Sequence, residues 1–426
     1  MRETNNRKKR IISLTLAILL LAGTLIPNSP ISPITEKQAQ VHQYLSPFDS
    51  DAVALKIQER IYYGIMEHKE TIDLSDSPVP VAEFGKIWSD MRDETPDLYM
   101  VKGTYSYTYK TINGMRYVTK FRPKYTMTAE EMAEAQLVWA NEIQEILSKR
   151  NPNWNDIQTM MYFHDYLVLK CNYDRTYTYY DAYNMLTKDT GVCMAYTLLY
   201  QALMEALGYS LDYVTSVEMN HIWNRIRVGD SMYNIDVTWD DPTPDRLGQV
   251  KHEYLLISDS AMDDDHQYTW EEGYGQCMND YYDDMFWRDV NTAIIPVGDE
   301  FFFIYKGSFY KWTADNKLVK CVSLSSKWYT DKQKSRYWYR NNTDGSKNLN
   351  FSVLWPAGDK ILYNATSSIK TLDPKTNKLA TVYTYKGNGN ICGFSYDGST
   401  LTLQVGYNPF NMDECEIVTI PNFTVS

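Results

Sequence analysis

Apolar and polar positions along this chain follow two spacings, one typical of helices and one typical of strands. Apolar residues at helical spacing predict three helices, at about 51–68, 128–149 and 154–170. Thr128 and Glu131 have the spacing of a capping box, which marks the start of the second helix. Alternation of apolar and polar residues over 97–126, on both sides of the turn Asn113-Gly114, predicts a β-hairpin.

A fourth apolar stripe at helical spacing follows Gly191 and ends at Gly208, which predicts a helix with Cys193 in its first turn. The unpaired N–H groups and the positive dipole end at a helix start favour the thiolate, the nucleophilic form of cysteine. The same N–H groups can stabilise an oxyanion on an attacked carbonyl. A small buried side chain is nevertheless the commonest role of a free cysteine. The interpretation of Cys193 therefore depends on which groups accompany it.

Two alternating runs, 221–228 and 231–238, flank Gly229-Asp230, a dipeptide suited to a two-residue hairpin turn whose first residue has positive φ. Pairing Val228 with the first residue of the second run places a mostly apolar set of side chains on one face. That face is therefore predicted to be the core side of the hairpin.

The same register places His221 and Asp236 together on the other face, which also carries Trp223 and Thr238. There His221 is opposite Thr238 and diagonal to Asp236, near enough for a carboxylate to hold an imidazole. A thiol nucleophile needs a base to take its proton, and the base needs an acceptor on its other nitrogen. Cys193, His221 and Asp236 supply these three groups in chain order.

Three motifs in this region resemble the core motifs of the transglutaminase-like superfamily. They are GVCMAYT at 191–197, HIWN at 221–224 and YNIDVTWDDP at 233–242. A looser likeness to secreted bacterial members of the family extends to 180–186 and to 254–259, with His266 beyond. The family usually has a small residue after the histidine, where this chain has Ile222 on the predicted core face.

The resemblance implies an α+β fold, related to papain-like thiol proteases, in which the cysteine-bearing helix packs on an antiparallel sheet. Cys193 would be the nucleophile that forms a thioester with a carboxamide or peptide carbonyl. His221 would be the general acid and base, and Asp236 would orient the imidazole. Four matching positions are expected to support these three, namely Trp223, Asn224, Trp239 and Asp240. Tyr173 is a candidate oxyanion partner, although simple packing is the commoner role of a tyrosine.

The N-terminal residues have the layout of a secretory signal. Five basic residues precede an uncharged apolar run from Ile11 to Ile26, which Pro27 follows. The run is near the lower length limit of a spanning helix, so cleavage is expected rather than retention as an anchor. Either outcome places the rest of the chain outside the membrane.

Composition limits the remaining possibilities. Hydrophobic content of 44% and charged content of 23% are typical of a globular protein. A net charge of −12 disfavours nucleic acid and other polyanions as partners. The six cysteines are scattered without metal-ligand spacing, so neither a metal nor another cofactor is expected. If Cys193 stays free, at most two disulfides can form, and the sequence leaves open whether any does.

These patterns divide the chain into five predicted segments. They are a signal peptide or anchor at 1–30, a linker at 31–47, an α+β extension at 48–150, a catalytic domain at 151–288 and a mainly β accessory domain at 289–426. The last segment has short runs rich in Tyr, Phe, Val and Ile between turn residues. Such hairpins resemble propeller blades, but they are too few to close a ring.

The expected function is that of a secreted thiol enzyme at the cell envelope, acting on protein or peptide substrates that include cell-wall-associated ones. Transfer of the acyl group to an amine would cross-link proteins, and transfer to water would deamidate or hydrolyse them. The resemblance leaves the acceptor open. The alternative is a catalytically silent cell-surface binding module, because a fold does not imply turnover. Membrane contact is expected only through an uncleaved N-terminal segment.

Overall fold

The computed structural model describes residues 50–313, 315–324, 352–407 and 412–425. The predicted signal peptide or anchor at 1–30 and the linker at 31–47 lie outside the described residues. Within the described part of the chain, no helix combines the length and the apolar character needed to cross a bilayer. Helices and antiparallel sheets occur together, so the predicted α+β class is confirmed, whereas the five segment boundaries stay a prediction.

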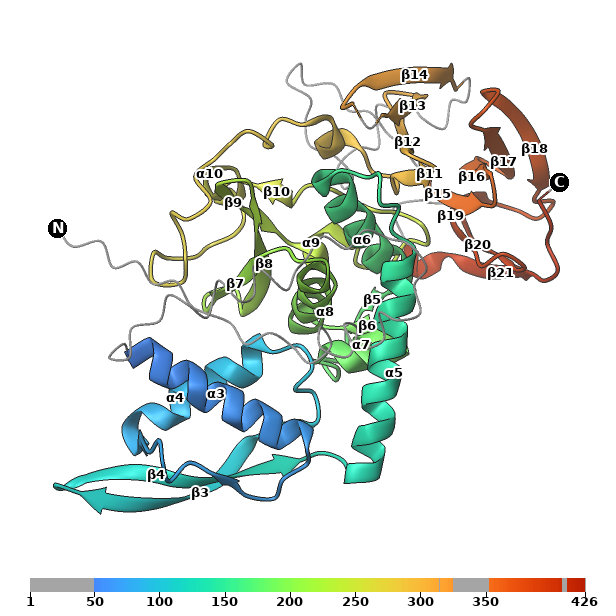
Figure 1. Cartoon of the computed structure of the whole chain (residues 1–426). Helices are drawn as coiled ribbons and strands as arrows, with labels where there is room; N and C mark the ends of the chain where they lie inside the picture. The colour runs from blue at the N-terminus through green and yellow to red at the C-terminus, as the bar shows by residue number, and fades with distance from the viewer. Residues whose placement is uncertain (1–49, 314, 325–351, 408–411, 426) are drawn as a thin grey trace.

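The N-terminal part combines two helices with a four-stranded sheet (Figure 1). Its elements are α3 (Ser50–Met66), β1 (Ile72–Asp73), β2 (Val79–Pro80), α4 (Val81–Glu94), β3 (Val101–Ile112) and β4 (Met115–Tyr125). The predicted hairpin is confirmed, because Asn113 and Gly114 both have positive φ between the paired strands β3 and β4. Phe84 and Trp88 of α4 pack with Phe121 of β4 in the buried core of this part.

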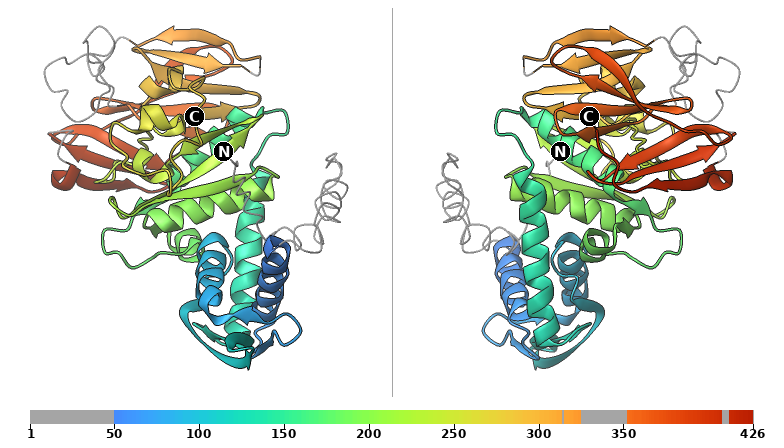
Figure 2. Two further views of the ribbon diagram at one scale, coloured as in Figure 1. Left: turned by 90° about the vertical axis from the view of Figure 1, so that its left-hand side faces the viewer. Right: turned by 90° about the vertical axis from the view of Figure 1, so that its right-hand side faces the viewer.

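Two capped helices lead into the central part. The predicted capping box is confirmed at the start of α5 (Ala129–Ser148), where Thr128 accepts from the N–H of Glu131 and the Glu131 carboxylate accepts from the N–H of Thr128. The next helix, α6 (Asp156–Lys170), begins slightly later than predicted because Asn155 caps it. Figure 2 shows α5 running along the side of the molecule from the N-terminal part to the central part.

The central part consists of a helix packed on a four-stranded antiparallel sheet of order β10-β9-β8-β7. Its elements are β5 (Asn172–Tyr173), α7 (Ala182–Lys188), β6 (Thr190–Gly191), α8 (Cys193–Ala206), β7 (Leu211–Ser216), β8 (His221–Val228), β9 (Ser231–Ile235), α9 (Val237–Asp240), β10 (Leu255–Ile257) and α10 (Asp259–Met262). Val228 pairs with Ser231 around Gly229 at positive φ, as the sequence predicts.

One expectation about this hairpin is wrong. The second strand was expected to run to Thr238, but β9 ends at Ile235 and the chain turns into α9. The cause is local, because the Asp236 carboxylate accepts a hydrogen bond from the N–H of Trp239 and thereby caps the helix. Both faces of β8 are covered, since Trp223 is buried in a small cluster with Val214 and Tyr254.

Three consecutive antiparallel sheets follow, in the upper part of Figure 1. After η3 (Phe286–Asp289), the first contains β11 (Ile295–Val297), β12 (Glu300–Tyr305), β13 (Ser308–Trp312) and β14 (Leu318–Ser323). The second contains β15 (Leu354–Ala357), β16 (Lys360–Ala365), β17 (Ser368–Asp373) and β18 (Lys378–Thr384). The third contains β19 (Asn390–Tyr396), β20 (Leu401–Gly406), η5 (Met412–Glu414) and β21 (Glu416–Ile420). One buried cluster runs from Trp139 of α5 to Leu372 of β17, so the first two sheets share the core of the central part.

A network of buried charges fastens α6 to α9. His164 hydrogen-bonds Asp165 through Nδ1 (2.9 Å) and Asp240 through Nε2 (3.1 Å). His252 donates from Nδ1 to the carbonyl of Val290 (2.8 Å) and contacts Asp165 through Nε2 (2.9 Å). Both rings are completely buried. Because buried carboxylates need compensating partners, this network fixes the position of α9 beneath the site described below.

We expect the stability of the fold to fall as pH rises from about 6.5 to about 9. Burial opposes protonation of His164, but its hydrogen bonds to Asp165 and Asp240 outweigh burial and raise its pKa to about 9. An unfolded chain releases the histidine proton near pH ~6.5, whereas the folded protein retains it. The contribution of this proton is therefore complete below that pH and is lost as pH rises through the folded-state pKa.

Guanidinium unfolding of wild type and His164→Gln at pH about 6 and pH about 10 measures this effect. The difference in unfolding free energy between the two proteins should shrink by on the order of 3 kcal/mol at the higher pH. A difference that stays constant between the two pH values would contradict the assignment of a bound proton to His164.

Candidate thiol active site

Cys193 is the first residue of α8, as the sequence predicts, and its side chain is partly exposed. The helix starts there because Gly191 pairs with Tyr173 in the short parallel strands β5 and β6, and Val192 then takes the N-cap position. A Cβ on Gly191 would lie 2.6 Å from the Cβ of Ala195. Only glycine therefore allows the chain to approach the first turn of α8 so closely, which sets where the thiol lies.

His221 begins β8 and faces the helix start. Thr197 of α8 donates a hydrogen bond to the carbonyl of Ile222 (3.1 Å), which ties the helix to the strand beside the imidazole. Cys193 lies close enough to the His221 ring to help raise the pKa of the imidazole. Since Nε2 of the ring is engaged on the far side by Asp236, Nδ1 is the nitrogen left for the thiol.

Asp236 is completely buried at the N-cap of α9, where it binds the imidazole from behind. His221 donates from Nε2 to Oδ2 of Asp236 at 2.5 Å, and Oδ1 accepts from the N–H of Trp239 at 3.1 Å. The structure thus brings together the three residues that the sequence singles out. The contact depends on the turn into α9 rather than on the expected extension of the β-hairpin.

The electrostatics favour a charged imidazole. Burial opposes protonation of His221, but the charge and hydrogen bond of Asp236, followed by the contact with Cys193, raise its pKa to about 10. Burial raises the pKa of Asp236, and the neighbouring imidazoles of His221 and His266 outweigh burial and lower it. The carboxylate is therefore ionised and the imidazole protonated at neutral pH, as required to stabilise a thiolate.

A second histidine shares the same carboxylate, and its role is not predicted by the sequence. His266 contacts Oδ2 of Asp236 through Nε2 at 3.0 Å and Oδ1 of Asp265 through Nδ1 at 2.8 Å. Its side chain is fully buried, whereas that of Asp265 is 46% exposed. Because both ring nitrogens face carboxylates, His266 must be protonated to donate to both. The sequence offers one sign of this role, namely that His266 follows the segment 254–259, which resembles the family.

Aromatic rings surround the two imidazoles. Trp223 stacks on His221 with ring centroids 5.6 Å apart, and Trp239 lies 5.8 Å from His221 and 4.2 Å from His266. Trp223 donates from Nε1 to the side chain of Asn234 (3.0 Å), which fixes the indole orientation. These two tryptophans match motif positions expected to support the triad, and here they separate the imidazoles from water.

The other two supporting positions lie deeper. Asp240, at the last residue of α9, accepts backbone N–H groups of Glu253 and Tyr254 as well as the His164 ring. It therefore anchors the segment that leads into β10. Asn224 is buried in β8, and within the described residues its Nδ2 has no hydrogen-bond partner. The structure gives no physical account of that unpaired amide.

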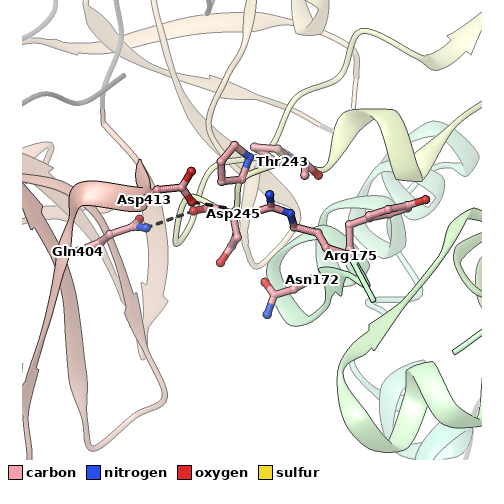
Figure 3. A pocket seen from close by; sticks show the side chains of 9 residues that line it. Asn172, Arg175, Thr243, Asp245, Gln404 and Asp413 are labelled. Carbon is pink, nitrogen blue, oxygen red and sulfur yellow. Dashed lines mark hydrogen bonds and ion pairs between the residues drawn. The ribbon is translucent and has the colours of Figure 1, made fainter. Parts of the chain in front are cut away.

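Tyr173 adjoins both the thiol and a surface pocket. Burial and then the proximity of Cys193 raise the pKa of Tyr173 to about 12, so its hydroxyl is protonated at neutral pH and able to donate. Tyr173 also lines a pocket of about 380 Å³, which Asp413 and Gln404 approach from one side and Asn172 and Arg175 from the other (Figure 3).

The pocket also contains the segment that follows α9. Burial raises the pKa of Asp245 to about 6, and the backbone carbonyl of Asp245 accepts a hydrogen bond from Gln404 of β20 (3.1 Å). Arg175 lies 3.9 Å from Asp413 across the opening. The pocket therefore joins the central part to the third C-terminal sheet.

Two groups of side chains are close enough to be considered as metal ligands. They are His164, Asp165 and His252, and His221, Asp236 and His266. In both groups the histidine nitrogens and carboxylate oxygens already lie at hydrogen-bond distance from one another. Hydrogen bonds between the rings and the carboxylates account for both arrangements.

The outer carboxylate should determine how strongly His266 holds its proton. Burial disfavours the protonated ring, whereas hydrogen bonds to Asp236 and Asp265 raise its pKa. Asp265→Asn should therefore lower the pKa of His266, as measured by imidazole NMR. Asp264→Asn is the matched control, because it removes an exposed neighbouring carboxylate with no hydrogen bond to His266. Equal shifts in the two variants would argue against a specific contact.

Known proteins that are similar to this chain include one family and several solved structures. Residues 144–240 match the family model of the Transglutaminase-like superfamily. No curated protein matches the chain. One similar solved structure is a TGase, with 15% identity and a TM-score of 0.23 over 31% of this chain and 44% of that one. Another is a provisionally assigned cysteine protease from Cytophaga hutchinsonii, with 14% identity and a TM-score of 0.21 over 33% of this chain and 63% of that one. The N-terminal domain of Nup159 is also similar, with 10% identity and a TM-score of 0.19 over 50% of this chain and 44% of that one.

In each structural comparison, the matched part spans less than two thirds of the other protein. The family match covers α6, α8, β8 and Asp236, the elements that bring the thiol, imidazole and carboxylate together. The chain therefore contains a domain of the transglutaminase-like superfamily at residues 144–240.

Proposed function

We propose that this protein is a secreted thiol enzyme that attacks a carboxamide or peptide carbonyl through Cys193. The observation that carries the proposal is a thiol at a helix start, beside an imidazole whose Nε2 donates to the buried Asp236. A cysteine that only fills space in the core does not require an imidazole and a buried carboxylate beside it. Secretion is supported by the basic and apolar N-terminal pattern, and the proposed location is the outer face of the cell envelope or beyond.

The first half of the reaction follows from the atoms in place. In the resting site the proton of Cys193 is held on Nδ1 of His221, so the sulfur is a thiolate, and it bonds to the carbonyl carbon of the substrate. The carbonyl oxygen becomes an oxyanion, which the free N–H groups of the first turn of α8 can stabilise, with Tyr173 as a candidate donor. The carbon–nitrogen bond then breaks, the departing amine takes the proton from His221, and a thioester remains on Cys193.

The second half requires an acceptor. An amine or a water molecule gives a proton to His221 and attacks the thioester carbon, after which the carbon–sulfur bond breaks and Cys193 departs as a thiolate beside the protonated ring. An amine acceptor gives protein cross-links, whereas water gives deamidation or peptide hydrolysis. The proposal covers both outcomes, with proteins or peptides, including those associated with the cell wall, as the substrate class.

A second candidate function is binding without turnover. The observation in its favour is the pocket between the central part and the third C-terminal sheet, which the residues of the triad do not line. In that case the transglutaminase-like domain serves as a scaffold, and the pocket holds a ligand at the cell surface. Substitution of Cys193 would leave such binding intact.

The principal experiment compares residues 31–426 as wild type, Cys193→Ala and Cys321→Ala. The last variant is the matched control, because Cys321 is a partly buried free cysteine of the remote strand β14. Each protein is incubated with a glutamine-rich protein and a labelled primary amine, and products are identified by mass spectrometry. We expect product formation with wild type and Cys321→Ala, and none with Cys193→Ala.

The type of product identifies the acceptor. Amine adducts establish acyl transfer to an amine, whereas new N-termini or deamidated glutamines establish transfer to water. Identical results for all three proteins would overturn the proposed enzyme and favour the binding module.

His221→Ala tests the contact between the thiol and the imidazole. Without the protonated ring, the thiolate of Cys193 loses its neighbouring positive charge, so alkylation by iodoacetamide at pH about 6 should slow by roughly tenfold or more. Peptide mapping by mass spectrometry separates Cys193 from the other five cysteines. Equal alkylation rates in wild type and variant would remove the basis for an activated thiol.

A further inference from the structure

The β3–β4 hairpin carries a charge opposite to that of the remaining chain. Residues 101–125 contain six basic residues and no acidic residue, although the whole chain has a net charge of −12. The residues outside the hairpin therefore sum to −12 − 6 = −18. The six cations are Lys102, Lys110, Arg116, Lys120, Arg122 and Lys124. Whole-chain charge, which disfavours anionic partners, conceals this local excess.

The cations of the hairpin are not neutralised by ion pairs. Over the described ranges of the chain, none of the six lies within 4.0 Å of a carboxylate. Arg122 donates to the hydroxyl of Thr108, and Arg116 lies over the ring of Tyr109. One acidic neighbour is Asp73, which pairs with Lys120 across β1 and β4 and accepts hydrogen bonds from Ser75.

The strand register places four of these cations on one face of the hairpin. Lys120 pairs with Thr108 and Arg122 with Ser106, while Lys110 lies two residues along β3 from Thr108 on the same side. Lys124 follows Arg122 by two residues and shares that side. We call Lys110, Lys120, Arg122 and Lys124 the basic face. The opposite face packs on α4, where Phe84 contacts Tyr105 and Tyr107.

The end of the hairpin adds apolar surface to the basic face. Ile112 and Met115 pair directly across the turn, on the same side as Lys110, and are 46% and 56% exposed. Tyr107 and Tyr109 are also exposed, but they lie on the opposite face of the hairpin. Figure 1 shows the hairpin extending past α3 and α4 at the lower edge of the molecule, so its end is clear of the rest of the protein.

We propose that the β3–β4 hairpin docks on an anionic lipid bilayer, with its basic face against the headgroups and Ile112 and Met115 in the interface. Basic residues beside a membrane attract anionic lipid, and apolar side chains gain by leaving water for the headgroup boundary. A soluble acidic polymer would use the cations alone and leave the apolar end in water. The lipid surface is therefore the partner that accounts for both features, and this inference is independent of the chemistry proposed at Cys193.

The test uses residues 31–426, because the basic residues within 1–30 would themselves attract anionic lipid. Sedimentation measures binding to vesicles of phosphatidylcholine alone and of phosphatidylcholine mixed equally with phosphatidylglycerol. Lys110→Gln/Lys124→Gln removes half of the basic face. Lys320→Gln/Lys378→Gln makes the same charge change at exposed positions on β14 and β18, which belong to other sheets.

We expect wild type and the β14/β18 control to bind the mixed vesicles more tightly than the neutral ones. The hairpin variant should bind the mixed vesicles roughly 25-fold more weakly, since each basic residue near an anionic surface contributes about fivefold. Ile112→Ser/Met115→Ser should also weaken binding, whereas Leu318→Ser/Val319→Ser, an exposed apolar pair on β14, should not.

Two results would overturn the inference. The first is equal loss of vesicle binding in the hairpin variant and its lysine control. The second is wild-type binding to dextran sulfate as tight as to the mixed vesicles, together with no effect of Ile112→Ser/Met115→Ser, which would identify an acidic polymer as the partner instead. Circular dichroism and unchanged alkylation of Cys193 verify that each variant is folded.

Discussion

The arrangement of the site depends on two buried carboxylates, one at each end of the single-turn helix α9. Asp236, before the first turn, receives His221 and His266, and Asp240, at the other end, receives His164 and two backbone N–H groups. A buried carboxylate without partners is strongly unfavourable, so the elements that supply these partners must lie where they do. One short turn thereby fixes α6, β8 and the approach to β10 relative to one another.

The same constraint sets the electrostatics around the thiol. Starting from Cys193, the groups alternate as thiol, imidazole, carboxylate, imidazole and carboxylate, ending at the half-exposed Asp265. Alternating charges stabilise each member through its neighbours, which is how two protonated imidazoles persist in a buried site. Trp223 and Trp239 strengthen these interactions because they keep water away from the rings.

Function also depends on how charge is distributed over the surface rather than on its total. The chain is acidic as a whole, yet the β3–β4 hairpin is uniformly basic and has an apolar end. The hairpin belongs to the N-terminal part, whereas the thiol lies in the central part. The proposed attachment to a surface and the proposed chemistry therefore use separate elements of the chain.

Features that depend on local spacing can be predicted from the amino-acid sequence alone. These are the capping box at Thr128, the turn at Asn113-Gly114, the start of α8 at Cys193 and the pairing around Gly229, because neighbouring residues alone decide them. The end of β9 does not follow from the pattern, because hydrophobic alternation continues past Ile235 while the cap made by Asp236 turns the chain. The contacts of His266 and His164 with the buried carboxylates follow only from the tertiary structure. His266 is 30 residues from Asp236 in the sequence, and His164 is 76 residues from Asp240. Such contacts arise when packing removes charges from water and only distant partners can compensate them.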